Sequence, residues 1–366
     1  MDAPAGLARL AECVRAAHAD GTPLRIVGGG TKDFLGRSPA AGEADAAALR
    51  GITRLEPDEL VLSAYAGTPL AEVEQAVAEA GQCLAFEPPR FAPGGTFGGM
   101  VASGLSGPAR ASCGAVRDFV LGASMLNGRG ELLHFGGQVM KNVAGFDVSR
   151  LLAGSFGTLG IVCEATVKLT PLPAAQATLA FDLPQAEALL RVNRWSGEPL
   201  PLRASAWSGG RLFVRLAGAA AAVAAARRAL GGEVLGDEAA AALWDGLRDH
   251  AHPWFVAARE RIAQSPAAVL WRACVPGTTP PLDTDAPVLV EWSGAQRWVL
   301  DDSGTARVRE LALAAGGHAT AFRRGAAADV RVFTPPAPVP ALLQRRLQAA
   351  FDPAGILNRG HPFAQD

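Results

Sequence analysis

Three glycine-rich stretches limit what this chain can fold into more than any other feature of its sequence. They cover residues 28–32, 93–107 and 154–160. The first stretch follows directly on residues 24–27 (LRIV), which predict a short buried strand. A strand that runs into consecutive glycines exposes backbone N–H groups in a concave turn. Such turns bind phosphate because no Cβ atom blocks the approach, and two of them on opposite sides could hold a diphosphate.

The usual nucleotide-binding sequences are absent. A dinucleotide fingerprint that began at Gly28 would need a glycine at position 33, where the chain has Asp33. Lys32 is followed by that aspartate rather than by serine or threonine, so no P-loop is formed. Each glycine pair taken singly could be a tight turn without a ligand. Three glycine-rich loops in one lobe nevertheless favour ligand binding over that alternative.

The composition indicates a globular protein with no electrostatic preference for nucleic acid or lipid. The chain has 366 residues, 49% of them apolar, and a formal net charge of −1 at pH 7. Its longest apolar run, residues 216–226, is mostly alanine and is too short to span a bilayer. The first residues show neither the basic nor the apolar segment of a signal peptide. We therefore expect a cytoplasmic location.

The cysteines and histidines do not form a recognisable metal site. The five cysteines are odd in number, far apart and without a C-x-x-C pair. This pattern argues against a disulfide framework, a zinc site or an iron–sulfur cluster held by this chain alone. His250 and His252 could supply two ligands to a metal ion, but no third ligand is evident. We expect no metal.

The character of the chain changes at residues 171–173 (Pro-Leu-Pro), which predicts a domain boundary. We expect a first domain over residues 1–172, an α+β domain over residues 173–335 and a C-terminal helix and tail over residues 336–366. In the second domain, strand-like runs alternate with alanine-rich helical runs. This pattern predicts one antiparallel sheet with helices on one face. No repeat of fixed period is visible.

Four segments of the first domain together resemble a known family. They are residues 28–32 (GGGTK), 93–104 (PGGTFGGMVASG), 117–122 (RDFVLG) and 154–162 (GSFGTLGIV). Their order and spacing are similar to those in the FAD domain of the vanillyl-alcohol oxidase and p-cresol methylhydroxylase (PCMH) superfamily. The resemblance implies an α+β fold: a two-lobed PCMH-type FAD-binding domain, then an α+β cap domain with an antiparallel sheet. It also implies that the C-terminal tail returns to the flavin region.

Three further segments narrow the resemblance. Residues 141–151 (KNVAGFDVSRL) are typical of the glycolate and D-lactate oxidase branch, and residues 86–89 (FEPP) and 351–358 (FDPAGILN) are similar to the FAD-binding E subunits of bacterial glycolate oxidase. The resemblance implies an oxidoreductase subunit for a small 2-hydroxy acid. Its implied partners are a larger flavin subunit and an iron–sulfur subunit, with no nucleic acid and with a membrane reached only through these partners.

The resemblance also implies where FAD binds. The first two glycine loops would hold the pyrophosphate and ribityl chain, and the third would line the flavin through backbone groups. The expected FAD-binding residues are Gly28, Gly29, Gly30, Thr31, Lys32, Pro93, Gly94, Gly95, Thr96, Gly98, Gly99, Ala102, Ser103, Gly104, Arg117, Asp118, Gly157, Gly160 and Ile161. Superfamily members with covalent flavin commonly use a histidine in the first loop. This chain has Thr31 and Lys32 there, so we expect non-covalent FAD.

No catalytic residue stands out, and Lys141 and His318 are the two candidates. Lys141 could place its charge near the pyrimidine edge of the flavin, or it could pair with Asp147 at the surface. His318 follows two glycines and could face the flavin or be a turn residue. The histidine and glutamate segments with which relatives bind a metal and position the substrate are absent, and the usual G-S-E-G reads GSFG at residues 154–157.

These departures weaken the case for substrate oxidation by this chain alone. They fit a flavin subunit that relays electrons or supports a catalytic partner. The alternatives are a self-sufficient FAD-dependent 2-hydroxy acid dehydrogenase and a non-catalytic scaffold that has lost its flavin. The intact glycine loops argue against the scaffold.

Overall fold

The computed structural model describes residues 3–36, 42–137 and 147–361, which form two compact units. Unit 1 contains residues up to 105, residues 114–172 and the residues from 335 onward; unit 2 contains residues 106–113 and 173–334. The sequence predicts that the short segment 106–113 belongs to the first domain, but in the structure it is part of unit 2. The segment belongs to unit 2 because Ser112 Oγ donates to the carbonyl of Arg203 at 2.6 Å and Trp292 Nε1 donates to the carbonyl of Gly107 at 3.0 Å.

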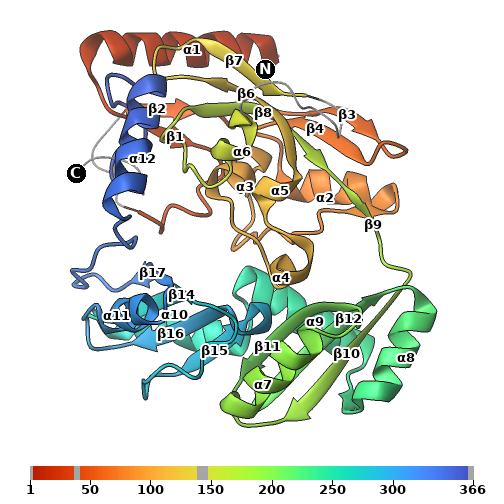
Figure 1. The fold of residues 1–366 in the computed structure, drawn as a ribbon. Helices are drawn as coiled ribbons and strands as arrows, with labels where there is room; N and C mark the ends of the chain where they lie inside the picture. The colour runs from red at the N-terminus through yellow and green to blue at the C-terminus, as the bar shows by residue number, and fades with distance from the viewer. Residues whose placement is uncertain (1–2, 37–41, 138–146, 362–366) are drawn as a thin grey trace. The chain divides into compact units, whose positions relative to one another are not determined.

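Unit 1 is built on a five-stranded antiparallel sheet (Figure 1). In spatial order its strands are β3 (Ile52–Glu56), β4 (Val61–Tyr65), β8 (Ile161–Lys168), β6 (Val120–Leu126) and β7 (Leu132–Gly136). The sequence alternation predicts that β8 buries one face only, but Val162 and Thr166 of the other face are buried too. The reason is its central position, because β8 pairs with β4 and β6 and α3 (Phe97–Ser103) packs against it.

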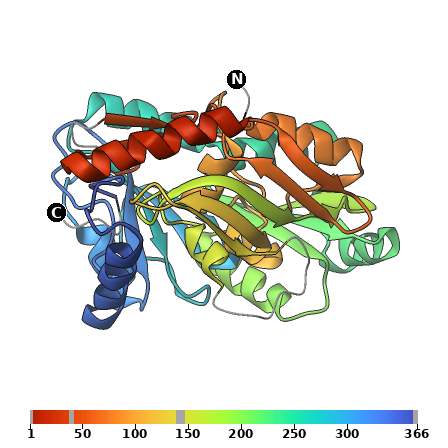
Figure 2. The same ribbon diagram turned by 90° about the horizontal axis from the view of Figure 1, so that it is seen from above.

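A parallel pair of short strands, β1 (Leu24–Val27) and β2 (Gly42–Asp45), carries the first glycine loop. The helix α1 (Ala3–Asp20) lies along this pair (Figure 2). It packs there through Leu10 and Val14, which are buried. The C-terminal segment lies on the other side of β1: Leu24 N donates to the carbonyl of Ile356 at 2.7 Å, and Asn358 N donates to the carbonyl of Leu24 at 2.9 Å. This pairing brings the tail to the end of β1 where the glycine loop begins.

The smaller elements of unit 1 complete its surface. They are α2 (Leu70–Glu79), β5 (Gln82–Cys83), α5 (Val116–Phe119), α6 (Val148–Leu152), β9 (Thr170–Pro171) and α12 (Pro338–Phe351). No helix in the described part of the chain is long and apolar enough to cross a membrane.

Unit 2 contains one antiparallel sheet of eight strands, in the order β13-β10-β12-β11-β15-β16-β14-β17. The strands are β10 (Ala175–Asp182), β11 (Leu202–Ser208), β12 (Arg211–Gly218), β13 (Glu233–Val234), β14 (Val269–Cys274), β15 (Val288–Glu291), β16 (Gln296–Asp301) and β17 (His318–Arg324). Its two halves, β10–β13 and β14–β17, have the same topology. Read from the outer edge of the sheet inward, each half has its fourth strand first, then its first, third and second strands. They join through β11 and β15. The topology is repeated, although the sequence shows no repeat.

Helices cover both faces of this sheet, so the predicted arrangement with helices on one face is wrong. The helices α7 (Gln185–Ser196), α8 (Ala220–Leu230) and α11 (Arg307–Ala314) pack on the face that carries Val214 and Trp271. On the opposite face lie α9 (Asp237–Asp249) and α10 (Pro253–Gln264): Trp244 Nε1 donates to Thr178 Oγ1 at 2.9 Å, and Phe255 contacts Trp298 with ring centroids 5.2 Å apart. The sequence pattern predicts neither α10 nor β17. The short helix α4 (Arg110–Cys113) and the turn η1 (Trp292–Gly294) complete unit 2.

Candidate cofactor site

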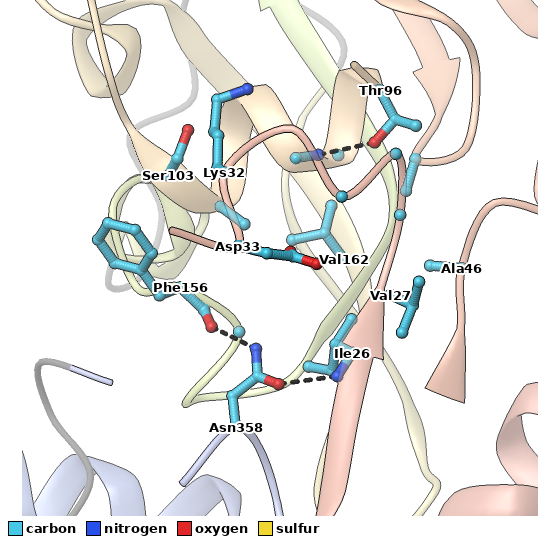
Figure 3. Close-up of a pocket in the computed structure, with 18 of the residues that line it drawn as sticks. Ile26, Val27, Lys32, Asp33, Ala46, Thr96, Ser103, Phe156, Val162 and Asn358 are labelled. Atoms are coloured by element: carbon cyan, nitrogen blue, oxygen red, sulfur yellow. Dashed lines mark hydrogen bonds between the residues drawn. The ribbon is translucent and has the colours of Figure 1, made fainter. Parts of the chain in front are cut away.

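The first glycine loop leaves β1 and presents its backbone to a pocket (Figure 3). Within the described residues, the backbone N–H groups of Gly29, Gly30 and Thr31 donate to no protein acceptor. Gly30 has a φ of +67°, a left-handed conformation that glycine adopts without strain. Asp33 N donates to the carbonyl of Gly30 at 3.2 Å and closes the turn. Unengaged N–H groups that follow one another in such a turn make an anion-binding nest.

Arg25 connects this loop to β2. Its Nη1 lies 3.1 Å from Asp33 Oδ2, and its Nη2 lies 2.5 Å from Glu43 Oε1. The hydrogen bond to Glu43 is the largest of the effects that raise the pKa of Arg25 above its usual value, and Asp33 adds to it. Because Asp33 and Glu43 are exposed and Arg25 is partly exposed, we expect these ion pairs to orient the loop more than they stabilise the fold.

The second glycine stretch comes into backbone contact with the first. A Cβ atom on Gly29 would lie only 1.6 Å from the carbonyl oxygen of Gly94. Only glycine at position 29 therefore allows the two loops to pass so close to each other. Thr96 caps α3, since its Oγ1 accepts from Gly99 N at 3.2 Å. Gly98 N donates to the carbonyl of Ala66 at 2.7 Å, and a Cβ atom on Gly98 would lie 2.5 Å from Ala66 Cβ. Glycine at positions 29 and 98 is thus required by the packing of the protein against itself.

The third stretch is joined to β1 by the C-terminal tail. The Nδ2 of Asn358 donates to the carbonyl of Phe156 at 2.6 Å, and its Oδ1 accepts from Ile26 N at 2.7 Å (Figure 3). Phe156 has a φ of +52° and Gly157 a φ of +74°. A Cβ atom on Gly157 would lie 2.6 Å from Ile26 Cδ1 and 2.8 Å from Asn358 Nδ2. The glycine therefore makes room for the tail.

The three stretches meet around one pocket of unit 1. The expected residues that line the pocket are Gly28, Gly29, Gly30, Thr31, Lys32, Thr96, Gly98, Gly99, Ala102, Ser103, Gly157 and Gly160. Among them, Lys32 brings a positive charge; its Nζ donates to Thr31 Oγ1 at 3.3 Å and lies 5.8 Å from the centre of the Phe91 ring.

Seven expected residues do not line this pocket: Pro93, Gly94, Gly95, Gly104, Arg117, Asp118 and Ile161. Their surroundings indicate structural roles for several of them. Gly104 ends α3 with a φ of +60°. The Oδ2 of Asp118 accepts from Ala115 N at 2.8 Å at the start of α5, next to the exposed Arg117. Ile161 is buried in the core that also holds Leu126.

Ten lining residues are absent from the expected set: Arg25, Ile26, Val27, Asp33, Ala46, Ala66, Phe156, Val162, Asn358 and His361. The tail supplies two of them. The ring of His361 stacks on Phe156 with centroids 5.7 Å apart, and its Nδ1 is buried without a hydrogen-bond partner in the described structure. Burial lowers the pKa of His361, so a neutral imidazole lines the pocket at pH 7. The only sequence signal for these two residues is the segment 351–358, because Asn358 is its last residue and His361 follows it closely.

The structure places only one of the two candidate catalytic residues. Lys141 falls outside the described residues. His318 begins β17 of unit 2, where it lies opposite Cys274 of β14.

The histidine pair of unit 2 shapes the connection between two helices. His250 ends α9 with a φ of +58° and stacks on Phe255 at 3.8 Å, whereas His252 Nδ1 accepts from Trp254 N at 3.3 Å at the start of α10. Among the described residues, no group of three or more His, Cys, Asp and Glu side chains could hold a metal ion.

Comparisons with known proteins identify the family. The family model described as FAD binding domain matches residues 2–136. The glycolate oxidase subunit GlcE of Escherichia coli (strain K12) is 40% identical over 359 residues, which are 97% of this chain and 97% of that protein. This chain belongs to the GlcE family. As a GlcE-family protein it has FAD as its cofactor and is a subunit of an FAD-dependent oxidoreductase. The family and cofactor expected from the sequence are confirmed.

Two other matches add to this result. The glycolate oxidase subunit GlcD of Bacillus subtilis (strain 168) is 43% identical over 84 residues, 23% of this GlcE-family chain and 18% of GlcD. A solved structure of alkyldihydroxyacetonephosphate synthase has a TM-score of 0.62 and 14% identity, and covers 95% of this chain and 74% of its own. At that identity the match shows the fold alone. It agrees with the α+β fold expected from the sequence.

Proposed function

We propose that this chain is the flavin subunit of a glycolate oxidase and that it binds FAD without a covalent bond in the pocket of unit 1. The observation that carries the proposal is the row of unengaged N–H groups at Gly29, Gly30 and Thr31 in the pocket wall. A diphosphate needs convergent donors and a positive charge, and the nest and Lys32 would supply them. Thr96 and Gly99 lie across the same pocket and would face the cofactor from the second loop.

The rest of the pocket suits a planar aromatic group. Its apolar lining includes Ile26, Val27, Phe156 and Val162, and the neutral ring of His361 stacks on Phe156. When bound, FAD supplies the two-electron chemistry. The residues of this chain would hold its phosphates, orient its ring system and exclude water from part of the site.

The GlcE family assigns the chain to a multi-subunit glycolate oxidase. We infer that its partners are a larger flavin subunit similar to GlcD and an iron–sulfur subunit, and that the substrate of the complex is glycolate or another small 2-hydroxy acid. We further infer a cytoplasmic location, with any membrane contact made through these partners.

Within such a complex we propose that this chain serves electron transfer rather than substrate activation. Removing a hydride from a 2-hydroxy acid requires a group that takes the hydroxyl proton and a cation that holds the carboxylate. Phe156 occupies the position where relatives carry a glutamate, and it contributes its carbonyl to Asn358 rather than a carboxylate to the pocket. A self-sufficient dehydrogenase remains the alternative, and Lys141 and His318 are its candidate residues.

The first experiment tests flavin binding. The purified chain should be yellow, and acid or heat should release all of its flavin into the supernatant. The denatured polypeptide should carry no flavin absorbance. Absorbance that stays with it would contradict the non-covalent claim, and a His361→Ala variant would then show whether this histidine forms the bond. A colourless protein would favour the scaffold.

The second experiment tests the division of labour. The isolated chain is assayed with glycolate and D-lactate and an artificial dye acceptor, and then again with its partner subunits added. We expect little or no turnover alone and full turnover in the complex. Strong glycolate–dye activity of the isolated chain would overturn the electron-transfer role in favour of the self-sufficient dehydrogenase.

A further inference from the structure

Unit 2 brings a cysteine and a histidine together at the edge of its sheet. Cys274 of β14 and His318 of β17 are directly opposite each other in the antiparallel pair, so their side chains lie next to each other on the same face of the sheet. Cys274 is half-buried, and His318 is exposed. The facing residue on β16 is Gln296, which carries no charge. His318 is therefore the titratable residue that faces Cys274 across the strand pairs.

Two arginines add positive charge around this pair. The guanidinium groups of Arg110 and Arg272 both lie over the ring of Trp292, at 4.5 Å and 5.0 Å from its centre. Arg272 is held in place because its Nε donates to Gln296 Oε1 at 2.7 Å, and Gln296 Nε2 in turn donates to the buried Glu291 at 2.9 Å. Both arginines interact electrostatically with Cys274 and with His318.

The positive charges around Cys274 lower the pKa of its thiol. Burial alone would raise the pKa of Cys274, but Arg272, His318 and then Arg110 lower it below the usual value. Cys274 in turn raises the pKa of His318, so each group favours the charged form of the other. Cys163 shows the opposite case within the same chain, because burial in unit 1 raises its pKa to about 12. A thiolate, rather than a thiol, is the nucleophile in cysteine chemistry.

We propose that Cys274 is a reactive thiolate that hydrogen peroxide oxidises to a sulfenic acid, with His318, Arg272 and Arg110 as the groups that hold its charge. In this step the sulfur attacks one peroxide oxygen, an S–O bond forms and the O–O bond breaks. The sulfur loses two electrons to the peroxide, and the departing hydroxide takes a proton from the His318 imidazolium and leaves as water. The inference is independent of the flavin site of unit 1.

The test compares the labelling rates of all five cysteines in the full-length protein by mass spectrometry. At near-neutral pH, Cys274 should react with iodoacetamide several-fold faster than Cys13, Cys83 and Cys113. Its reactivity should rise at a lower pH than theirs. Anionic iodoacetate should favour Cys274 still more, because the arginines attract it. After brief exposure to hydrogen peroxide, dimedone should label Cys274 first.

Two variants separate the proposed cause from simple exposure. His318→Gln and Arg272→Met should each slow the labelling of Cys274 several-fold and shift its pH profile upward. His134→Gln, which alters an exposed histidine of β7 in unit 1, is the matched control and should leave the rate unchanged. The proposal is overturned if Cys274 labels no faster than the other thiols, if dimedone does not label it, or if His318→Gln leaves its profile in place.

Discussion

Asn358 and Phe156 are 202 residues apart in sequence, yet the side-chain amide of Asn358 donates a hydrogen bond of 2.6 Å to the backbone carbonyl of Phe156. The same amide accepts from Ile26 N at 2.7 Å. One side chain from the tail therefore holds the end of β1 against the third glycine stretch. The local backbone is unusual here, since both Phe156 and Asn358 have positive φ angles. Such angles persist in non-glycine residues only where the surroundings enforce them.

The first prediction concerns Asn358→Ala. This change leaves Ile26 N and the carbonyl of Phe156 without their partner, so we expect the free energy of unfolding to fall by about 1–3 kcal/mol. The flavin content should also fall, because the walls of the pocket separate. Thermal unfolding and the ratio of flavin to protein absorbance measure the two effects.

Asn193→Ala is the control for Asn358→Ala. Asn193 Nδ2 donates to the carbonyls of Leu189 at 2.8 Å and Gly277 at 2.9 Å within unit 2. Its loss should destabilise unit 2 while leaving the flavin bound. An Asn358→Ala protein with unchanged stability and full flavin would contradict the role assigned to the tail.

The second prediction concerns the contact between the first two glycine stretches. In Gly29→Ala the new Cβ would lie 1.6 Å from the carbonyl oxygen of Gly94, so the loops must separate and the flavin content should drop sharply. Gly209→Ala is the control, since its Cβ meets no atom within 4 Å at a φ of +58°. It should cost about 1–2 kcal/mol for the left-handed backbone and leave the flavin in place. Equal flavin loss in both variants would mean that backbone strain, not loop contact, is responsible.

The third prediction separates two neighbouring glycines of α3. A Cβ on Gly98 would lie 2.5 Å from Ala66 Cβ and 2.9 Å from its Cα, whereas a Cβ on Gly99 would meet only Thr96 Oγ1, at 3.1 Å. Gly98→Ala should therefore lower the melting temperature, by forcing α3 away from the segment after β4. Gly99→Ala should keep the fold and weaken flavin binding. Circular dichroism measures the melting temperatures of the two proteins, and flavin titration measures their flavin binding. A Gly98→Ala protein that is stable but free of flavin would contradict the packing role assigned to Gly98.

These glycines also show what the sequence could and could not predict. Runs of glycine after an apolar strand mark a phosphate-binding turn locally, and so the pocket-lining stretches are evident from the sequence. The neighbour that each glycine accommodates is not a local property. Gly29 makes room for Gly94 and Gly157 makes room for Asn358, and neither contact can be read from residue types alone.

Neither β17 nor the repeated topology of unit 2 is predicted from the sequence, for a similar physical reason. The strand β17 contains His-Ala-Thr-Ala, whose alanines have little intrinsic preference for strands. It forms because six of its seven residues pair with β14, for instance Ala319 with Ala273. The twofold repetition of the sheet is likewise carried by strand order, so it leaves no period in the sequence. Tertiary pairing decides these elements, whereas the alanine-rich helices are evident from their composition.

The fourth prediction concerns pH. Burial, together with Arg323, Arg272 and Arg259, lowers the pKa of His250 well below its usual value, so the folded protein holds this imidazole neutral. The unfolded chain takes up the proton near pH 6.5, and the folded chain does not. The free energy of unfolding should therefore be highest above that pH and fall as the solution becomes more acidic, by up to about 1.4 kcal/mol per pH unit for one proton. His252 and His361 act in the same direction, because burial lowers the pKa of each.

The variant that tests this is His250→Asn, because asparagine tolerates the left-handed backbone at the end of α9 (φ +58°). It loses the stacking on Phe255 and should be less stable at every pH, so the informative quantity is the slope. Urea unfolding between neutral and mildly acidic pH should show a smaller loss of stability for the variant than for the natural protein. The control is His134→Asn at the exposed position on β7, which should keep the natural slope. A His250→Asn protein with the full natural slope would show that the buried imidazole is not the group that the acid titrates.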